Sequence, residues 1–348
     1  MIVKCDSRMN IKKKSNTIQA IPSIRKDFDA VKTSHKTYRP ASRLALMVFS
    51  IGLAASVYAA DAEPQPFLAE NPCNISDPGF GIYDSWGHNV ILGQILMPHS
   101  GGLTSKNEFD VIIHFHGSDA IRKTLVPAAR GVFVVGVDLG VGSGAYQRAF
   151  LSPHVFPELL DSIENAVAEH AHVAHAHIRK LGLSGWSAGY GAIREILRQD
   201  ASARVDSVAL IDGLHADYDE TDISGMQTEQ LAPFVRFAKR AARGNKFMFV
   251  SHSNIIPPGY ASTTETAHYL VKTLRGKILR SSGHDGLYLS RYEQAKIGKF
   301  LMRGYLGDGK SDHCAEIGVM PGVVATLEKR WKTPRGKGAI PTRAALTP

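Results

Sequence analysis

Short apolar runs alternate with segments of helical periodicity through the middle of the chain, and this alternation constrains the fold more than any other feature. The runs at residues 109–115 and 132–137 are apolar almost throughout, as strands covered on both faces must be. Apolar residues recur with helical spacing at residues 156–170, and the same order is repeated to about residue 305. Repeated strand-then-helix order predicts an α/β fold, with a mainly parallel, doubly wound sheet and helices on both faces.

The individual elements follow from the same pattern. The expected strands are residues 91–97, 109–115, 132–137, 181–183, 205–211 and 246–250. The expected helices are residues 156–170, 192–198 and 229–243, a helix that starts at Ser262, and a closing helix at 287–305. The start at Ser262 carries Glu265 three residues later, which is the pattern of a capping box.

The length of 348 residues fits one catalytic domain with extensions at both ends. We expect a basic leader with a signal peptide at residues 1–62, a folded domain at 63–315 and a basic C-terminal extension at 316–348. Residues 1–43 carry a net charge of +8 and residues 329–348 carry +6, so subtracting both from the total of +9 leaves the body at −5. A mildly acidic body argues against nucleic acid as a partner.

An uncharged run at residues 44–60 follows Arg39 and Arg43 and ends in small residues. This is the layout of a secretory signal, about residues 39–60, with cleavage after Ala59 or Ala62. The run is short for a membrane span, so we expect a periplasmic or secreted protein without stable membrane insertion. Cys73 and Cys314 would then remain, and an oxidising compartment favours a disulfide between them, although two unpaired thiols are the alternative.

The motif Gly185-Trp186-Ser187-Ala188-Gly189 lies between an expected strand and an expected helix. Small residues flank the serine because a sharp strand-to-helix turn leaves no room for larger ones. The turn exposes the Ser187 hydroxyl as a nucleophile and directs the Ala188 N–H toward a developing oxyanion. The earlier segment His116-Gly117-Ser118 ends another strand, and we expect the N–H of Gly117 or Ser118 to be the second oxyanion donor.

His284 follows a glycine late in the chain, after the last expected strand. A base must be nearly neutral at the working pH and free to reach the serine, so a loop histidine beside glycine suits the role. His114 and His116 are expected to pack or to orient their loop.

The carboxylate that would hold the histidine is the least constrained member of the site. Asp212 ends the strand at residues 205–211 and would project from the carboxyl edge of the sheet. The next strand is followed by residues 251–254, which include no carboxylate. We therefore favour Asp212, with Asp217, Asp219 and Glu265 as rivals.

In this order, the HG loop, the GxSxG turn, an acid and a histidine resemble the α/β-hydrolase superfamily over about residues 85–305. The resemblance implies the fold and a serine esterase that forms an acyl-serine on a small ester, with no cofactor. It leaves the substrate and the oligomeric state open. The alternatives are an acyltransferase or a peptidase that uses the same serine, or a non-catalytic envelope binding protein.

Four histidines cluster at residues 170–177 and resemble a metal-binding tract. Their spacings do not place all four on one helical face, so we expect a solvated helix end and no metal.

Overall fold

The computed structural model describes residues 76–86, 88–99, 101–285 and 289–334. The predicted leader and signal, the Cys73 thiol and the end of the tail lie outside these residues. Among the described residues, no helix is long and apolar enough to cross a bilayer.

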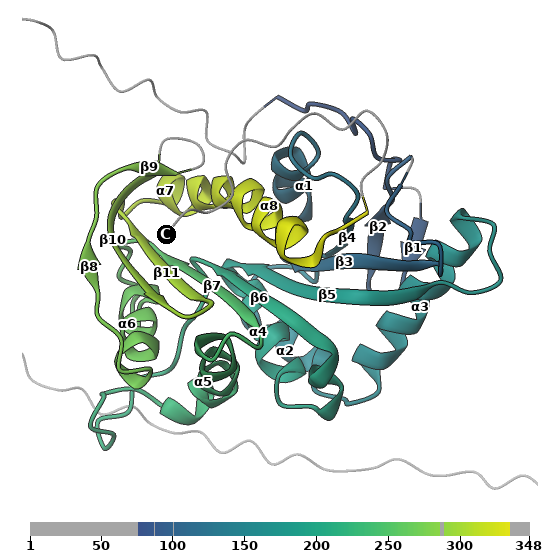
Figure 1. Cartoon of the computed structure of the whole chain (residues 1–348). Coiled ribbons are helices and arrows are strands. Elements are labelled where there is room, and N and C mark those ends of the chain that lie inside the picture. Colours follow the sequence, from purple (N-terminus) through teal and green to yellow (C-terminus); the bar gives the residue numbers. More distant parts are fainter. Residues whose placement is uncertain (1–75, 87, 100, 286–288, 335–348) are drawn as a thin grey trace, which may run out of the picture. The chain divides into compact units, whose positions relative to one another are not determined.

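The described residues contain an eleven-stranded sheet with a parallel centre and antiparallel edges (Figure 1). Strands β4, β3, β5, β6, β7 and β11 are parallel to one another. In spatial order the strands are β1 (His88–Val90), β2 (Gly93–Leu96), β4 (Phe133–Val137), β3 (Glu108–Phe115), β5 (His177–Trp186), β6 (Val205–Ile211), β7 (Phe247–His252), β11 (Phe300–Tyr305), β10 (Leu289–Ile297) and β8 (Leu279–Arg280), with β9 (His284–Asp285) paired to β10.

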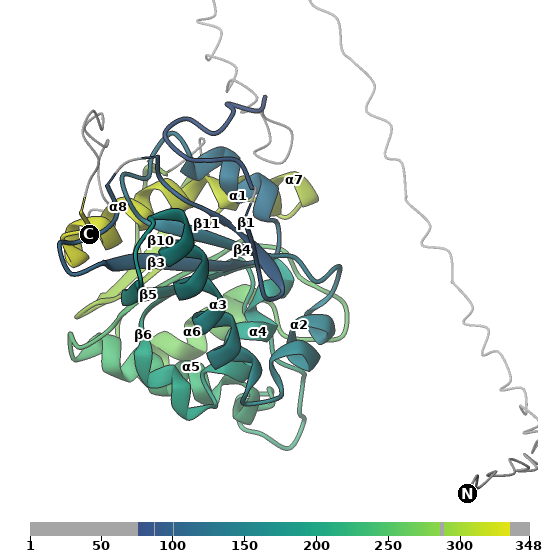
Figure 2. The same cartoon turned by 90° about the vertical axis from the view of Figure 1, so that its right-hand side faces the viewer.

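Helices cover both faces of the sheet, as Figures 1 and 2 show. On one face lie α1 (Ser118–Leu125), α7 (Lys310–Ala315), η3 (Glu316–Val319) and α8 (Met320–Trp331). On the other face lie α2 (Ser143–Phe150), α3 (Val155–His170), α4 (Tyr190–Ile196), α5 (Thr228–Ala242) and α6 (Thr263–Thr273). The short helix η1 (Ser187–Gly189) connects β5 to α4, and the short helix η2 (Asp200–Arg204) connects α4 to β6.

Two hydrophobic layers hold the helices to the sheet, and the alternation of side chains along each strand decides which layer a residue enters. On β3, Val111 and Ile113 pack with α2–α6, whereas Ile112, between them, packs with α1 and α8. These three side chains are at most 1% exposed, so β3 is covered on both faces. The predicted α/β architecture with a doubly wound sheet is confirmed.

Two sequence predictions are wrong at the C-terminal end of the domain. The expected helix at residues 287–305 is the hairpin β10–β11, in which Ile297 pairs with Phe300. Gly298 makes the two-residue turn possible, because its φ is +59° and a Cβ there would lie 2.0 Å from the Ala242 carbonyl oxygen.

The second wrong prediction is that a basic C-terminal extension begins at residue 316. Residues 316–331 form η3 and α8, and Met320, Leu327 and Trp331 are buried in the core beside the sheet. The Thr333 hydroxyl also donates to Asp110, whose carboxylate is fully buried, at 2.7 Å. The folded domain therefore continues to at least residue 334.

Candidate active site

Ser187 stands on a strained turn between β5 and α4. Its φ is +49°, a left-handed conformation that non-glycine residues rarely adopt. The turn is packed tightly. A Cβ at Gly189 would lie 2.0 Å from the Phe115 carbonyl oxygen, and a Cβ at Gly213 would lie 2.4 Å from the Ser187 backbone carbonyl oxygen. The surrounding backbone thus fixes the serine at the carboxyl edge of the sheet, as the sequence predicts for a nucleophile turn.

Asp212 follows β6 at the same edge, and its side chain is 2% exposed. Its Oδ1 accepts hydrogen bonds from the Ser253 N–H at 3.0 Å and from the Thr263 hydroxyl at 2.6 Å. Its Oδ2 lies 2.7 Å from Nδ1 of His313. Burial raises the pKa of Asp212, but the hydrogen bonds from His313, Thr263 and Ser253 outweigh it and hold the pKa below its usual value. Asp212 is therefore an ionised acceptor fixed in one orientation.

His313 lies on α7, the first helix after β11. Its ring stacks on Trp186 with a centroid distance of 4.8 Å, and the Trp186 indole N–H donates to the His313 carbonyl oxygen at 3.0 Å. With Nδ1 occupied by Asp212, the remaining ring nitrogen, Nε2, is the one available to a serine hydroxyl. Sequence reasoning missed this histidine.

Ser187, Asp212 and His313 line one cleft with a volume of about 310 Å³. Ile255, Pro257 and Tyr260 give it an apolar side. The other residues in contact with it are His215, Thr263, Asp308 and Lys310. Such a cleft can hold a small molecule with an apolar part and a polar reacting group.

The structure does not place His284 in this cleft. His284 is an exposed residue of β9, where it pairs with Ser290 of β10, and it is absent from the residues that line the cleft. The prediction of His284 as the partner of the acid is wrong, because the Asp212 carboxylate is bonded to His313 instead. The error follows from the misread hairpin: β11 is the last strand, and His284 precedes it.

The rival carboxylates each have another structural role. Asp217 accepts from the Gln230 amide, and Asp219 accepts from Thr221 in a local turn. Glu265 closes the capping box with Ser262, as predicted. Asp212 alone of the four candidates lines the cleft.

The predicted oxyanion donors in the HG loop are already bonded. The Gly117 N–H donates to Asp138 at 2.7 Å, and the Ser118 N–H donates to the same carboxylate at 3.1 Å. The expectation for Gly117 and Ser118 is therefore wrong in this structure, because Asp138, at the end of the neighbouring strand β4, occupies both N–H groups.

His114 and His116 hold the HG loop in place, as predicted. Burial lowers the pKa of His114 to about 4, so the ring is neutral and accepts from the Ser184 hydroxyl at 2.7 Å. Its other nitrogen then donates to the His116 carbonyl oxygen at 2.7 Å. The His116 ring stacks on Trp186 at a centroid distance of 5.3 Å. His313 stacks on the same indole.

The orientation of the His116 proton follows from Tyr146. The Tyr146 hydroxyl accepts from the Leu139 N–H at 3.1 Å and lies 3.0 Å from His116 Nδ1. The hydroxyl proton is available to Nδ1, and when Tyr146 donates it there, Nε2 is the protonated nitrogen of the neutral ring. Burial lowers the pKa of His116, consistent with the neutral form.

The histidines at residues 170–177 do not gather at one point. His172, His175 and His177 are exposed, whereas His170 is half-buried and lies near Asp84 and His88. Cys314 is disulfide-bonded. Its predicted partner Cys73 lies outside the described residues, so the pairing stays a prediction.

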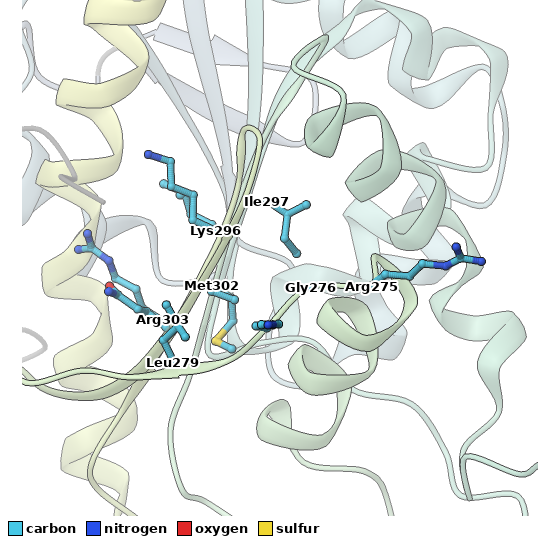
Figure 3. A pocket seen from close by; sticks show the side chains of 11 residues that line it. Arg275, Gly276, Leu279, Lys296, Ile297, Met302 and Arg303 are labelled. Atoms are coloured by element: carbon cyan, nitrogen blue, oxygen red, sulfur yellow. The ribbon is translucent and has the colours of Figure 1, made fainter.

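A larger hollow of about 540 Å³ lies beside β8, β10 and β11 (Figure 3). Arg275, Lys277, Lys296 and Arg303 give its lining a positive character, and Figure 3 shows Arg275 and Lys296 extending away from each other. No serine, cysteine, histidine or carboxylate is among the described residues that line it. It offers none of the groups of acyl transfer, and the cleft at Ser187 remains the candidate active site.

No family model matches the chain, and no curated protein matches it. Three solved structures illustrate what the fold is similar to. An enterobactin esterase from Shigella flexneri is 12% identical over 77% of this chain and 64% of its own, with a TM-score of 0.42. A poly(3-hydroxybutyrate) depolymerase from Bordetella parapertussis is 15% identical over 66% of this chain and 83% of its own, with a TM-score of 0.40.

The third structure, a cold-adapted esterase from an Arctic intertidal metagenomic library, is 13% identical over 69% of this chain and 87% of its own, with a TM-score of 0.39. These likenesses are too distant to assign an activity. The molecule's own features are more direct: a mainly parallel sheet, a strained serine after β5, and an acid and a histidine that follow in that order. On these features the chain has the α/β-hydrolase fold.

Proposed function

We propose that this protein is a serine hydrolase that cleaves small carboxylic esters through an acyl-serine intermediate. Ser187 is the nucleophile, His313 the general base and Asp212 the acid that orients it. The observation that carries the proposal is the 2.7 Å bond between Asp212 and His313 in a cleft that Ser187 also lines. This replaces His284 in the predicted triad and retains its other two members.

In the proposed reaction, His313 Nε2 takes the proton of Ser187 as the hydroxyl oxygen attacks the ester carbonyl. The resulting imidazolium is stabilised by the ionised Asp212, whose pKa is held low by its three hydrogen bonds. His313 then protonates the leaving alcohol as the C–O bond breaks. Water repeats the sequence on the acyl-serine and releases the acid.

The developing oxyanion needs donors in fixed positions. The Ala188 N–H, next to the strained serine, is the first donor in this proposal. Since Asp138 occupies the Gly117 and Ser118 N–H groups, we assign the second role to the Nε2–H of His116. The tautomer in which Tyr146 donates to Nδ1, and the stacking of both His116 and His313 on the Trp186 indole, support this assignment.

Export to an oxidising compartment is part of the proposal. The predicted signal at about residues 39–60 would deliver the domain to the periplasm or the medium. The disulfide at Cys314 supports this, because such bonds persist mainly outside the reducing cytosol.

A fluorophosphonate probe and a panel of aryl and alkyl esters test the proposal. The wild type should be labelled and should hydrolyse short acyl esters best, since a cleft of about 310 Å³ is at the small end of ligand sites. Ser187→Ala should abolish labelling and lower kcat about 10⁴- to 10⁶-fold. Ser152→Ala, at an exposed serine, is the matched control.

Three other outcomes separate the alternatives. Faster transfer to added alcohols or amines than to water would make the protein an acyltransferase, and cleavage of amides would make it a peptidase. A well-folded wild type that is neither labelled nor active would contradict the proposal and favour a binding protein with this fold.

A further inference from the structure

Three possible metal ligands meet outside the proposed catalytic triad. His252 ends β7, His268 lies on α6 and Glu293 lies on β10, so three separate elements supply them. Glu293 Oε1 lies 3.0 Å from His252 Nε2 and 2.5 Å from His268 Nε2. The three ligand atoms all lie within 4.8 Å of one another.

The orientation of His252 exposes a lone pair to this cluster. The Thr264 hydroxyl donates to the Ser253 carbonyl oxygen at 2.7 Å, so it can only accept from His252 Nδ1, which lies 3.0 Å away. The Nδ1 nitrogen therefore carries the ring proton, and Nε2 is unprotonated in the neutral ring. A second partner that fixes the tautomer in this way is typical of metal-binding histidines.

The His252 Nε2 atom is fully buried, and it makes no hydrogen bond of acceptable geometry to Glu293 or to any other described residue. In the neutral ring, its lone pair instead faces a carboxylate oxygen, which is unfavourable without a cation between them. The space over the cluster depends on Gly304 of β11, because a Cβ there would lie 2.5 Å from His252 and 2.7 Å from Glu293.

We propose that His252, His268 and Glu293 bind a divalent transition-metal ion of the Zn²⁺ type. Two imidazole nitrogens and one carboxylate oxygen suit zinc, and a tetrahedral ion would hold such atoms about 3.3 Å apart. The His268 side chain is 39% exposed, so water can reach the fourth position. The sequence prediction of no metal did not consider these residues, because they are far apart in the chain.

The ion would tie together elements that also hold Asp212. His252 lies between Ser251 and Ser253, and both of these serines hydrogen-bond to Asp212. Thr264, the partner of His252, follows Thr263, which donates to Asp212. Binding should therefore stabilise the fold around the acid, and this consequence for stability does not depend on whether the protein hydrolyses esters.

The full chain, produced without a histidine tag and stripped with a chelator, is titrated with Zn²⁺ alone by calorimetry. We expect one Zn²⁺ bound through this site and a higher melting temperature by circular dichroism. His268→Gln and Glu293→Gln should each weaken binding at least tenfold and remove the thermal shift. His268 and Glu293 are chosen because, unlike His252, neither side chain is fully buried.

His170→Gln is the matched control, since His170 belongs to the other candidate cluster among the described residues, with Asp84 and His88. This variant should retain the binding and the thermal shift of the wild type. No binding to the wild type would overturn the proposal. Binding that survives in both His268→Gln and Glu293→Gln, or that disappears in His170→Gln alone, would overturn it as well.

Discussion

The region around the nucleophile turn, residues 108–196, and the C-terminal region, residues 279–331, each contribute a residue of the proposed triad to the same cleft. They differ in how clearly the local sequence specifies that residue. In the first, β3 and β5 are central strands whose carboxyl halves are almost continuously buried, and glycines mark the turn at Ser187. In the second, β10 is a half-exposed strand near the sheet edge, and His313 lies on a six-residue helix. Local sequence therefore specifies the nucleophile much more directly than the base.

The larger of the effects that sharpen this comparison concerns Asp212, which follows β6 outside both regions and binds His313 of the C-terminal region. Asp212→Asn should lower kcat about 10⁴-fold, because an amide cannot stabilise the imidazolium of His313 and favours the wrong tautomer. Steady-state kinetics on an aryl ester measure the effect. Asp217→Asn, at the exposed rival carboxylate, should leave kcat within about twofold of the wild type, and equal losses in both variants would contradict the account.

A stability measurement tests whether the C-terminal region belongs to the core. Trp331 is 3% exposed, and its indole N–H donates to Asp206 at 2.7 Å. Trp331→Ala should lower the free energy of unfolding by about 3–5 kcal/mol, since it leaves a cavity against the sheet. Urea denaturation measures this, with Leu151→Ala, at a 69% exposed side chain, as the control.

An unchanged urea midpoint in Trp331→Ala would contradict this account and show that residues 316–331 are an extension that the core does not need. A loss of unfolding free energy in Leu151→Ala, without one in Trp331→Ala, would have the same meaning.

The smallest expected effect is a pH dependence from the same region. Glu316 is fully buried, and burial, together with the charge of Asp212, raises its pKa well above the usual value. Its contribution to stability is complete below the ordinary carboxyl pKa and is lost as the pH rises toward the raised pKa. Glu316→Gln, which cannot ionise, should therefore melt higher than the wild type at about pH 8, with a smaller difference at about pH 4.

Glu220→Gln, at an exposed position, should show no such dependence. A Glu316→Gln variant that is less stable than the wild type at the higher pH would show that the buried carboxylate is ionised and paired.

The contrast between the regions explains which predictions the sequence allowed. The strand at residues 205–211 and the Ser262 capping box were readable from local pattern, because burial on two faces and a helix start leave short-range signals. Asp212 was also within reach, since an acid at a strand end projects toward the same edge as the serine. These features depend on neighbours in the chain.

The features that were missed depend on distant contacts. The residues of β10 have mixed polarity because most are only half-buried, so neither strand nor helix periodicity is clear, and Gly298 was the one short-range sign of a hairpin. Once the hairpin is recognised, β11 becomes the last strand and His313 the first histidine after it. The hydrogen bond that the Gly117 N–H donates to Asp138 joins the ends of two strands, so no local sequence pattern indicates it.

The proposed triad is tested most directly by comparing His313→Gln and His284→Gln in hydrolysis of one activated aryl ester. We predict that kcat/KM falls about 10⁴- to 10⁶-fold in His313→Gln and stays within about twofold of the wild type in His284→Gln. A large loss in His284→Gln, with activity retained in His313→Gln, would contradict the account.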